Sequence, residues 1–107
     1  MSSTLPLKHC DTKAPKLSDP EIAALLLQVP GWSIESNQLS RTFNFRNYYE
    51  SLAFVNATAW ISHGQDHHPD IALGYNAVTM RYSSHSAGGL TENDFICAAK
   101  VSALLTV

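Results

Sequence analysis

Three histidines in the second half of the chain, His67, His68 and His85, are the residues best suited to do chemistry. Histidine is the side chain whose ordinary pKa lets it donate and accept protons near neutral pH. His67 and His68 are adjacent, and Pro69 follows them directly. These residues therefore offer proton transfer, provided that the fold brings the pair and His85 together.

Two predicted strands between the histidines should do this. Apolar residues alternate with polar ones over 70–75 and again over 78–83, and turn-forming residues separate the two runs. An antiparallel hairpin that closes near Asn76 places position 67 opposite position 85. Because paired strands lie about 5 Å apart, we expect the three imidazoles to line one rim of the sheet. A register error of one residue would not separate them.

The spacing of polar residues predicts three helices, each starting with a capping box. At each start Ser, Asn or Thr stands three positions before Glu or Asp, so that its side chain can accept from a first-turn amide. The first helix should end before the Pro-Gly pair at 30–31. The second should end at about His63 or Gly64, because Pro69 disfavours helical geometry just before it. The three pairs are Ser18 with Glu21, Asn47 with Glu50, and Thr91 with Asp94.

Two further strands are predicted in the first half of the chain, at 32–34 and from Leu39 to Phe45. Alternation in the second run puts Leu39, Phe43 and Phe45 on one face. Arg41 interrupts that face, and we therefore expect this strand to lie at an edge of the sheet or at a subunit contact.

The composition predicts a globular chain, with 107 residues of which 45% are apolar and 15% charged. We expect residues 17–107 to form a single domain and residues 1–16, which lack periodicity, to form a flexible tail. The net charge of −2 and three scattered arginines argue against nucleic-acid binding. No apolar run approaches the ~20 residues of a membrane span, so a membrane protein is not expected.

The cysteines and the start of the chain predict a cytoplasmic protein. Met1 to Lys16 contains no apolar signal-peptide core. Cys10 lies in this polar leader and Cys97 in the last predicted helix, and two such cysteines do not make a disulfide framework. Free thiols in a reducing cytosol are therefore expected.

The residues alone also allow other interpretations. His63 and His67 are four apart, as on one face of a metal-binding helix, but a glycine stands where a metalloprotease motif needs Glu. The three central histidines could also hold zinc with an open position. Asp94 could be only the third residue of a helix cap, and Asp66 and Asp70 only loop carboxylates or groups that fix a histidine tautomer.

Two longer blocks of sequence resemble the pterin-4a-carbinolamine dehydratase family. The first covers 65–71, with the sequence QDHHPDI, and the second covers 84–94, with the sequence SHSAGGLTEND. The Gly-Trp pair at 31–32 and the Phe-Asn-Phe segment at 43–45 resemble the family's early signature. The resemblance runs from about residue 17 to residue 105, which is nearly the whole predicted domain.

The resemblance implies a small α+β domain in which a four-stranded antiparallel sheet has three helices packed on one face. It implies a lyase that dehydrates 4a-hydroxytetrahydrobiopterin, a pterin carbinolamine, to quinonoid dihydropterin in tetrahydrobiopterin recycling, with no metal and no bound cofactor. It also implies homodimers or homotetramers. An alternative function within the family is that of a protein-binding dimerisation cofactor without essential catalysis.

The resemblance also implies a set of site residues. Losing water from a carbinolamine needs an acid for the departing hydroxyl and a base for the ring N–H proton, and imidazoles suit both tasks. We place His68 near the hydroxyl and His67 or His85 as the base, and the sequence leaves that division open. His63 departs from the family, in which many members carry an acidic residue at this position. The expected catalytic residues are His67, His68, His85 and Asp94, and the expected pterin-binding residues are Asp66, His67, His68, Pro69, Ser83, Ser84, His85 and Ser86.

Overall fold

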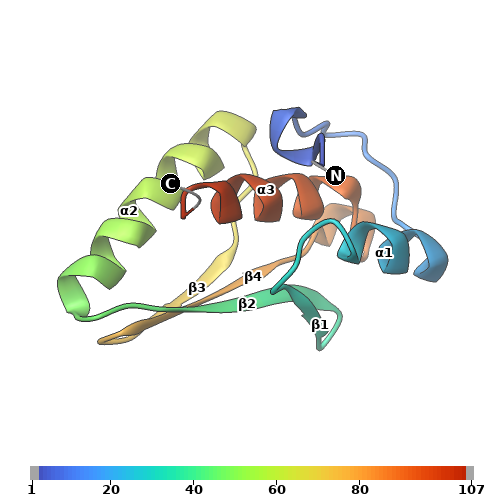
Figure 1. The fold of residues 1–107 in the computed structure, drawn as a ribbon. Coiled ribbons are helices and arrows are strands. Elements are labelled where there is room, and N and C mark those ends of the chain that lie inside the picture. Colours follow the sequence, from blue (N-terminus) through green and yellow to red (C-terminus); the bar gives the residue numbers. More distant parts are fainter. Residues whose placement is uncertain (1–2, 106–107) are drawn as a thin grey trace.

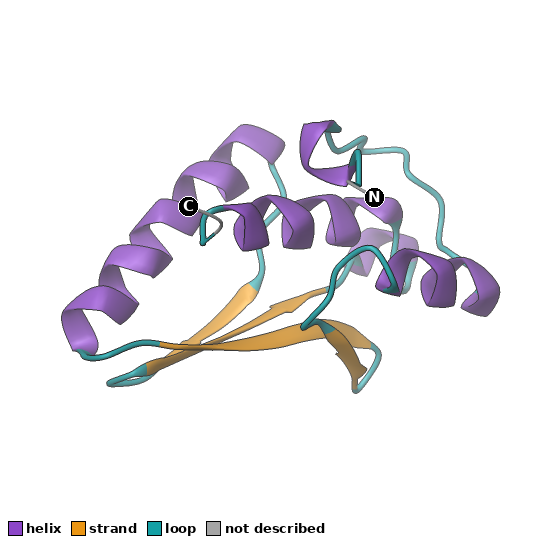
Figure 2. Ribbon diagram, viewed as in Figure 1, coloured by secondary structure: helices purple, strands orange, loops and turns teal. Residues whose placement is uncertain are grey.

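A computed structural model describes residues 3–105 of the chain (Figures 1 and 2). Its elements are η1 (Leu5–Leu7), α1 (Asp19–Leu26), β1 (Ser33–Glu35), β2 (Gln38–Asn44), α2 (Tyr48–Gln65), β3 (Asp70–Leu73), β4 (Ala77–Tyr82), η2 (His85–Ala87) and α3 (Glu92–Ala103), where η denotes a single 3-10 turn. The four strands form one antiparallel sheet in the order β1-β2-β4-β3. The helices α1, α2 and α3 all lie on one side of this sheet, so the α+β architecture implied by the resemblance is confirmed.

The helices start where the caps predicted. The first and third capping boxes form completely, at the starts of α1 and α3. At the start of α2 only half of the predicted box forms. Asn47 accepts from the Glu50 amide at 2.9 Å, but the Glu50 carboxylate accepts from the amide and the guanidinium of Arg46. An arginine one residue before the cap has therefore displaced the reciprocal hydrogen bond.

The core fills the space between the helices and the inner face of the sheet. Val78, Met80 and Tyr82 of β4 are all buried, as their alternation predicted. From α2, Phe54 packs against Phe43 of β2 with ring centroids 4.6 Å apart. The last helix, α3, is buried along most of its length, so it lies at the centre of the molecule.

Strand β2 lies inside the sheet, and the prediction that it lies at an edge was wrong. It pairs with β1 on one side and with β4 on the other. Arg41 points toward the helices, where its guanidinium carbon lies 4.5 Å from the centroid of the Phe43 ring and one nitrogen donates to the Ser102 hydroxyl at 3.1 Å. A cation–π contact and hydrogen bonds thus satisfy a charge on the apolar face.

The N-terminal segment packs against the domain, although the sequence suggested a flexible tail. Leu5 is only 2% exposed and belongs to the core. Lys100 of α3 donates to the carbonyl of Pro6 at 2.7 Å, and Asp11 and Asn93 exchange two hydrogen bonds at the start of α3. These separate contacts need no periodic sequence. Residues 1 and 2 of the predicted tail, and residues 106 and 107 of the predicted domain, lie outside the described part of the chain.

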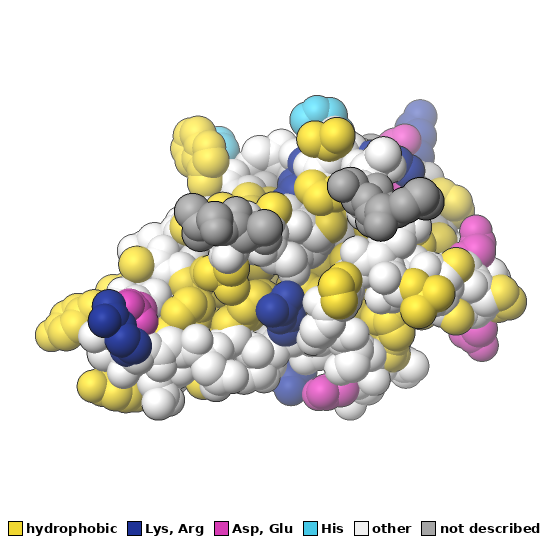
Figure 3. Space-filling model, viewed as in Figure 1, with side chains coloured by type: hydrophobic (Ala, Val, Ile, Leu, Met, Phe, Trp, Pro, Cys, Tyr) yellow, Lys and Arg dark blue, Asp and Glu magenta, His cyan; other side chains and the backbone are white. Residues whose placement is uncertain are grey.

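The surface mixes charged and apolar side chains. Figure 3 shows Lys and Arg scattered among Asp and Glu on the face it presents, with apolar side chains gathered where α2 begins and the β3–β4 hairpin turns. Across residues 3–105, no helix is both long enough and apolar enough to cross a membrane.

Candidate active site

The histidine pair comes directly after the end of α2. Asp66 closes the helix in the left-handed conformation, with φ of 50°, and its amide donates to the carbonyl of His63. The amide of His67 donates to the carbonyl of Ser62 at 3.2 Å, which folds the pair back against the last turn. Pro69 is buried and leads into β3. The helix extends slightly beyond its predicted end, and the proline still prevents it from including the histidines.

His85 comes from the other strand of the hairpin. After β4 the chain makes the single turn η2, which begins at His85 and closes at Gly88 with φ of 78°. The hairpin pairs Asp70 with Arg81, which aligns position 67 with position 84 rather than with the predicted 85. The register prediction was therefore wrong by one residue. As the sequence predicted, that shift leaves the three histidines around one cavity.

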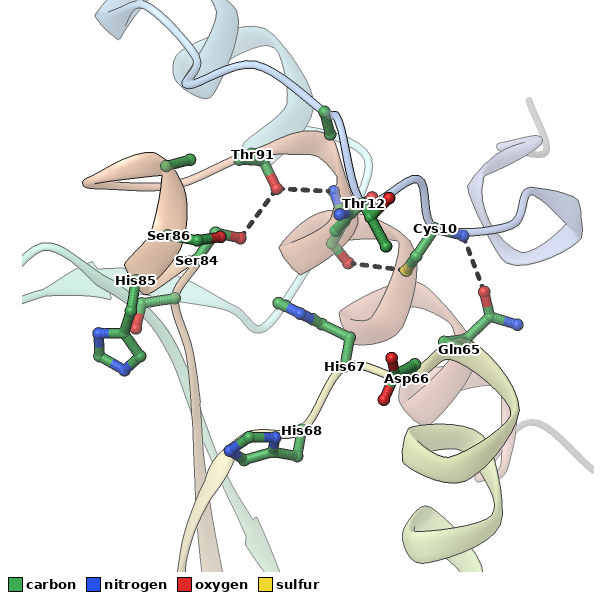
Figure 4. Close-up of a pocket in the computed structure, with 14 residues that line it drawn as sticks. Cys10, Thr12, Gln65, Asp66, His67, His68, Ser84, His85, Ser86 and Thr91 are labelled. Carbon is green, nitrogen blue, oxygen red and sulfur yellow. Dashed lines mark hydrogen bonds between the residues drawn. The ribbon is translucent and has the colours of Figure 1, made fainter.

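This cavity has a volume of about 270 Å³, close to the lower end of the ~300–1,000 Å³ usual for small-molecule sites (Figure 4). All three predicted histidines line it, together with Asp66 and the serines at 83, 84 and 86. Pro69, predicted to bind substrate, is buried outside the lining, and Asp94 lies behind His67. The lining residues that the sequence did not predict are Cys10, Thr12, Ala14, Gln65, Ala87, Thr91 and Asn93.

His67 and Asp94 form the most constrained contact of the site. His67 Nε2 lies 2.7 Å from Asp94 Oδ1, and the two side chains are 15% and 0% exposed. The other carboxylate oxygen, Oδ2, accepts from the Ser84 hydroxyl and from the Thr91 amide, both at 3.0 Å. Asp94 therefore completes the helix cap predicted from the sequence, and it also contacts one of the expected catalytic histidines. One oxygen completes the cap of α3, and the other holds His67.

This contact changes the basicity of His67. The hydrogen bond to Asp94 raises the pKa of His67 above its ordinary value, and the charge of the carboxylate acts in the same direction, while burial opposes both. The imidazole also stacks on the Tyr82 ring at an interplanar angle of 12°. Burial raises the pKa of Tyr82, whose hydroxyl is buried with no hydrogen-bond partner among the described residues. Tyr82 therefore fixes the plane of the His67 ring without exchanging a proton with it.

His68 and His85 are held much less tightly. Both side chains are exposed, and neither makes a hydrogen bond within residues 3–105. Figure 4 shows their imidazoles on one side of His67, with Cys10 and Thr12 on the other. The carboxylate that orients a histidine is Asp94, whereas Asp66 is an exposed residue of the cavity wall and Asp70 lies in β3.

The N-terminal segment forms a wall of the cavity that was not predicted from the sequence. Gln65, the last residue of α2, accepts from the amide of Cys10 at 2.8 Å, and this contact helps to hold residues 10–14 over the cavity. A polar, aperiodic stretch gives no sign of such packing. The only sequence signal was Cys10 itself, because a cysteine is more often buried than the residues around it.

The arrangement is suited to proton transfer. One imidazole is backed by a buried carboxylate, and two others reach both the cavity and solvent. His63 lies outside the lining. Over the described range 3–105, no three His, Cys, Asp or Glu side chains are grouped so that they could hold a metal ion.

Comparison with known proteins gives a consistent result. The family model described as "Pterin 4 alpha carbinolamine dehydratase" matches residues 15–104. A protein of Nitrosospira multiformis is 49% identical over 105 residues, covering 98% of this chain and 93% of that protein. One of Nitrosomonas eutropha is 54% identical over 99 residues, covering 92% and 88%. Both are named "Putative pterin-4-alpha-carbinolamine dehydratase".

Among solved structures, a similar fold occurs in a protein of Brucella melitensis described as a transcriptional coactivator/pterin dehydratase. The TM-score is 0.79 at 28% sequence identity, and the match covers 83% of this chain and 97% of that one. The sheet with helices on one face is thus shared by the two proteins.

Proposed function

The chain belongs to the pterin-4a-carbinolamine dehydratase family, and on this premise we propose that its histidine-lined cavity dehydrates a 4a-hydroxytetrahydropterin to quinonoid dihydropterin. The observation that carries the proposal is the convergence of three imidazoles on one cavity, with a buried carboxylate behind one of them. General acid–base groups of this kind typically contribute ~10²–10⁴-fold to a rate.

The reaction removes water from two neighbouring atoms of the pterin. The hydroxyl on C4a takes a proton from an acid, and the C4a–O bond breaks with its electron pair leaving on water. A base takes the proton from the neighbouring ring nitrogen, and the electrons of that N–H bond form the C=N bond. One proton is delivered and one is removed, so the acid and the base must exchange protons with solvent before the next turnover.

His67 is suited to the base. Asp94 makes its imidazole more basic and stabilises the imidazolium that forms when the ring accepts a proton. The Tyr82 ring holds the imidazole in one plane, so its free nitrogen has a fixed direction. Of the alternatives left open by the sequence, His67 is therefore favoured over His85 as the base.

His68 and His85 are suited to the acid. Both line the cavity and both are exposed, so each can give a proton to the leaving hydroxyl and regain it from water. We assign the hydroxyl to His68 first, with His85 beside it. Asp66 and the serines at 83, 84 and 86 form the wall against which the pterin ring is placed.

The test is the rate of water loss from 4a-hydroxytetrahydropterin, followed as kcat/KM for alanine variants at the three positions. We expect a fall of ~10²-fold or more in His67→Ala and His68→Ala, and a smaller fall in His85→Ala. His63→Ala is the matched control, because this exposed histidine lies outside the cavity and its loss should leave kcat/KM within about two-fold. Wild-type rates in all three cavity variants would exclude the proposal.

We further propose that the chain forms homodimers or homotetramers, as the resemblance implied. Large side chains are exposed on α2, where Tyr49 and Trp60 are each 78% exposed, and Tyr75 at the hairpin turn is 67% exposed. Figure 3 shows apolar side chains gathered where α2 begins and the β3–β4 hairpin turns. Light scattering of the purified chain tests the proposal, and a monomer at micromolar concentration would contradict it.

The alternative, a protein-binding module without essential catalysis, remains a prediction. The Brucella melitensis structure bears a description that names both a coactivator and a dehydratase. Purification of the chain with a stable protein partner, together with no turnover of the pterin, would favour the module over the enzyme.

A further inference from the structure

The two cysteines of the chain lie side by side, although they are far apart in sequence. Cys10 belongs to the N-terminal segment and Cys97 to α3, and their sulfur atoms are 3.6 Å apart. Both are free thiols in the structure. We propose that Cys10 and Cys97 form a peroxide-responsive dithiol that closes to a disulfide beside the cavity.

The contacts around Cys10 hold its sulfur close to Cys97. Its amide donates to the Gln65 side chain at 2.8 Å, and its thiol donates to the carbonyl oxygen of Asn93 at 3.7 Å. The next residue, Asp11, exchanges two hydrogen bonds with Asn93. The pair is therefore part of the packed structure. A disulfide needs a sulfur–sulfur distance of about 2.05 Å, so the sulfurs must approach by about 1.5 Å.

The two thiols differ in access. Cys10 is half-buried and lines the cavity, where a small oxidant can reach it, whereas Cys97 is fully buried. The contact with the Cys97 thiol lowers the pKa of Cys10, and the charges of His67 and Lys100 act in the same direction, while burial and the charge of Asp94 oppose them. The pKa of Cys97 is raised by the same contact and by burial. Cys10 is therefore the attacking thiolate and Cys97 the resolving thiol.

The chemistry takes two steps with hydrogen peroxide as the oxidant. The Cys10 thiolate attacks one peroxide oxygen, so that an S–O bond forms, the O–O bond breaks and hydroxide leaves to become water, giving a sulfenic acid. Cys97 then loses its proton and attacks the Cys10 sulfur. The S–S bond forms and the S–O bond breaks, with the oxygen leaving as a second water. Each sulfur is oxidised by one electron, and the peroxide is reduced to two waters. The disulfide ties residues 10–14, one wall of the cavity, to α3.

The test is oxidation of the purified full-length chain with about one equivalent of hydrogen peroxide. We expect the intact mass to fall by two hydrogen atoms, a peptide map to show Cys10 joined to Cys97 within one chain, and dithiothreitol to restore both thiols. Retention of both thiols at a peroxide concentration that oxidises glutathione would overturn the proposal. So would a disulfide formed between chains.

Single variants separate the roles of the two thiols. In Cys97→Ser the sulfenic acid on Cys10 should persist and react with dimedone, because its resolving thiol is absent. In Cys10→Ser, Cys97 should stay reduced, because it is buried. Cys97→Ala provides a second resolving-thiol variant should serine be poorly tolerated at this apolar position. Oxidation of Cys97 in Cys10→Ser at the wild-type rate would show that Cys10 is not the attacking group and would overturn the proposal.

Discussion

The histidines of the cavity are held in two opposite ways. His67 is hydrogen-bonded to a fully buried carboxylate and stacked on an aromatic ring, whereas His68 and His85 are exposed. The first arrangement fixes the direction and the basicity of an imidazole. The second leaves an imidazole free to rotate and to exchange protons with water. A site that both removes and supplies a proton in each turnover, as we propose here, benefits from having imidazoles of both kinds.

The largest difference between the tightly held His67–Asp94 pair and the exposed histidines should appear in the free energy of unfolding. Asp94→Ala removes the carboxylate that pairs with His67, Ser84 and the Thr91 amide, and it leaves those groups without their buried partner. We expect the free energy of unfolding to fall by about 3 kcal/mol. His85→Ala removes an exposed side chain and should change it by less than about 0.5 kcal/mol. Denaturant unfolding at a fixed protein concentration measures both changes. Equal losses of stability in the two variants would show that the two kinds of histidine are held equally tightly.

A smaller effect should appear in the dependence of stability on pH. Because Asp94 raises the pKa of His67 in the folded chain, His67 stabilises the fold fully below its ordinary pKa of about 6.5, and this contribution is lost as the pH rises through the raised pKa. The difference in stability between the wild type and His67→Gln should therefore be larger at pH 6 than at pH 9, by about 1 kcal/mol.

The control for this measurement is His85→Ala. The His85 side chain makes no hydrogen bond within residues 3–105, so its removal breaks none. An equally large dependence on pH in His85→Ala would show that the effect does not come from the contact between His67 and Asp94. A His67→Gln difference that grew with rising pH would reverse the sign and contradict the charged pair.

The smallest effect is expected at the aromatic ring beneath His67. The Tyr82 hydroxyl is buried without a hydrogen-bond partner in residues 3–105. Removing it therefore leaves no other buried group without a hydrogen-bond partner. Tyr82→Phe keeps the ring and its stacking on His67. We expect its unfolding free energy to be unchanged or to rise by up to about 1 kcal/mol. A loss of 2 kcal/mol in chemical denaturation would show that the hydroxyl has a partner in solution.

Local signals explain which parts of the fold could be predicted. The caps at Ser18 and Thr91 and the alternation over Val78 to Tyr82 are short-range patterns, and the structure follows them closely. The convergence of His67 with His85 required only the hairpin, and it tolerated the one-residue register error. These features are fixed by chemistry within a few residues or by one turn.

The features that could not be predicted depend on contacts between distant segments. Leu5 enters the core, and Cys10 reaches the cavity, through single contacts that leave no periodic pattern. Strand β2 was wrongly expected at an edge because the contacts that accommodate Arg41 on the apolar face, with the Phe43 ring of the same strand and with Ser102 of α3, leave no local pattern. For Asp94 the spacing predicted a helix cap, and only the resemblance placed it among the expected catalytic residues; its contact with His67 was not predicted.

The two oxygens of the Asp94 carboxylate have different partners, and this limits which substitutions the site can tolerate. The same side chain sets where α3 begins and how basic His67 is. A substitution that tunes the basicity of His67 through Asp94 therefore also alters the first turn of the central helix, and such variants would need compensating stability elsewhere. The side chains of His68 and His85 cap no helix and make no hydrogen bond within residues 3–105. Substitutions at these two exposed positions should therefore cost much less folding stability than one at position 94.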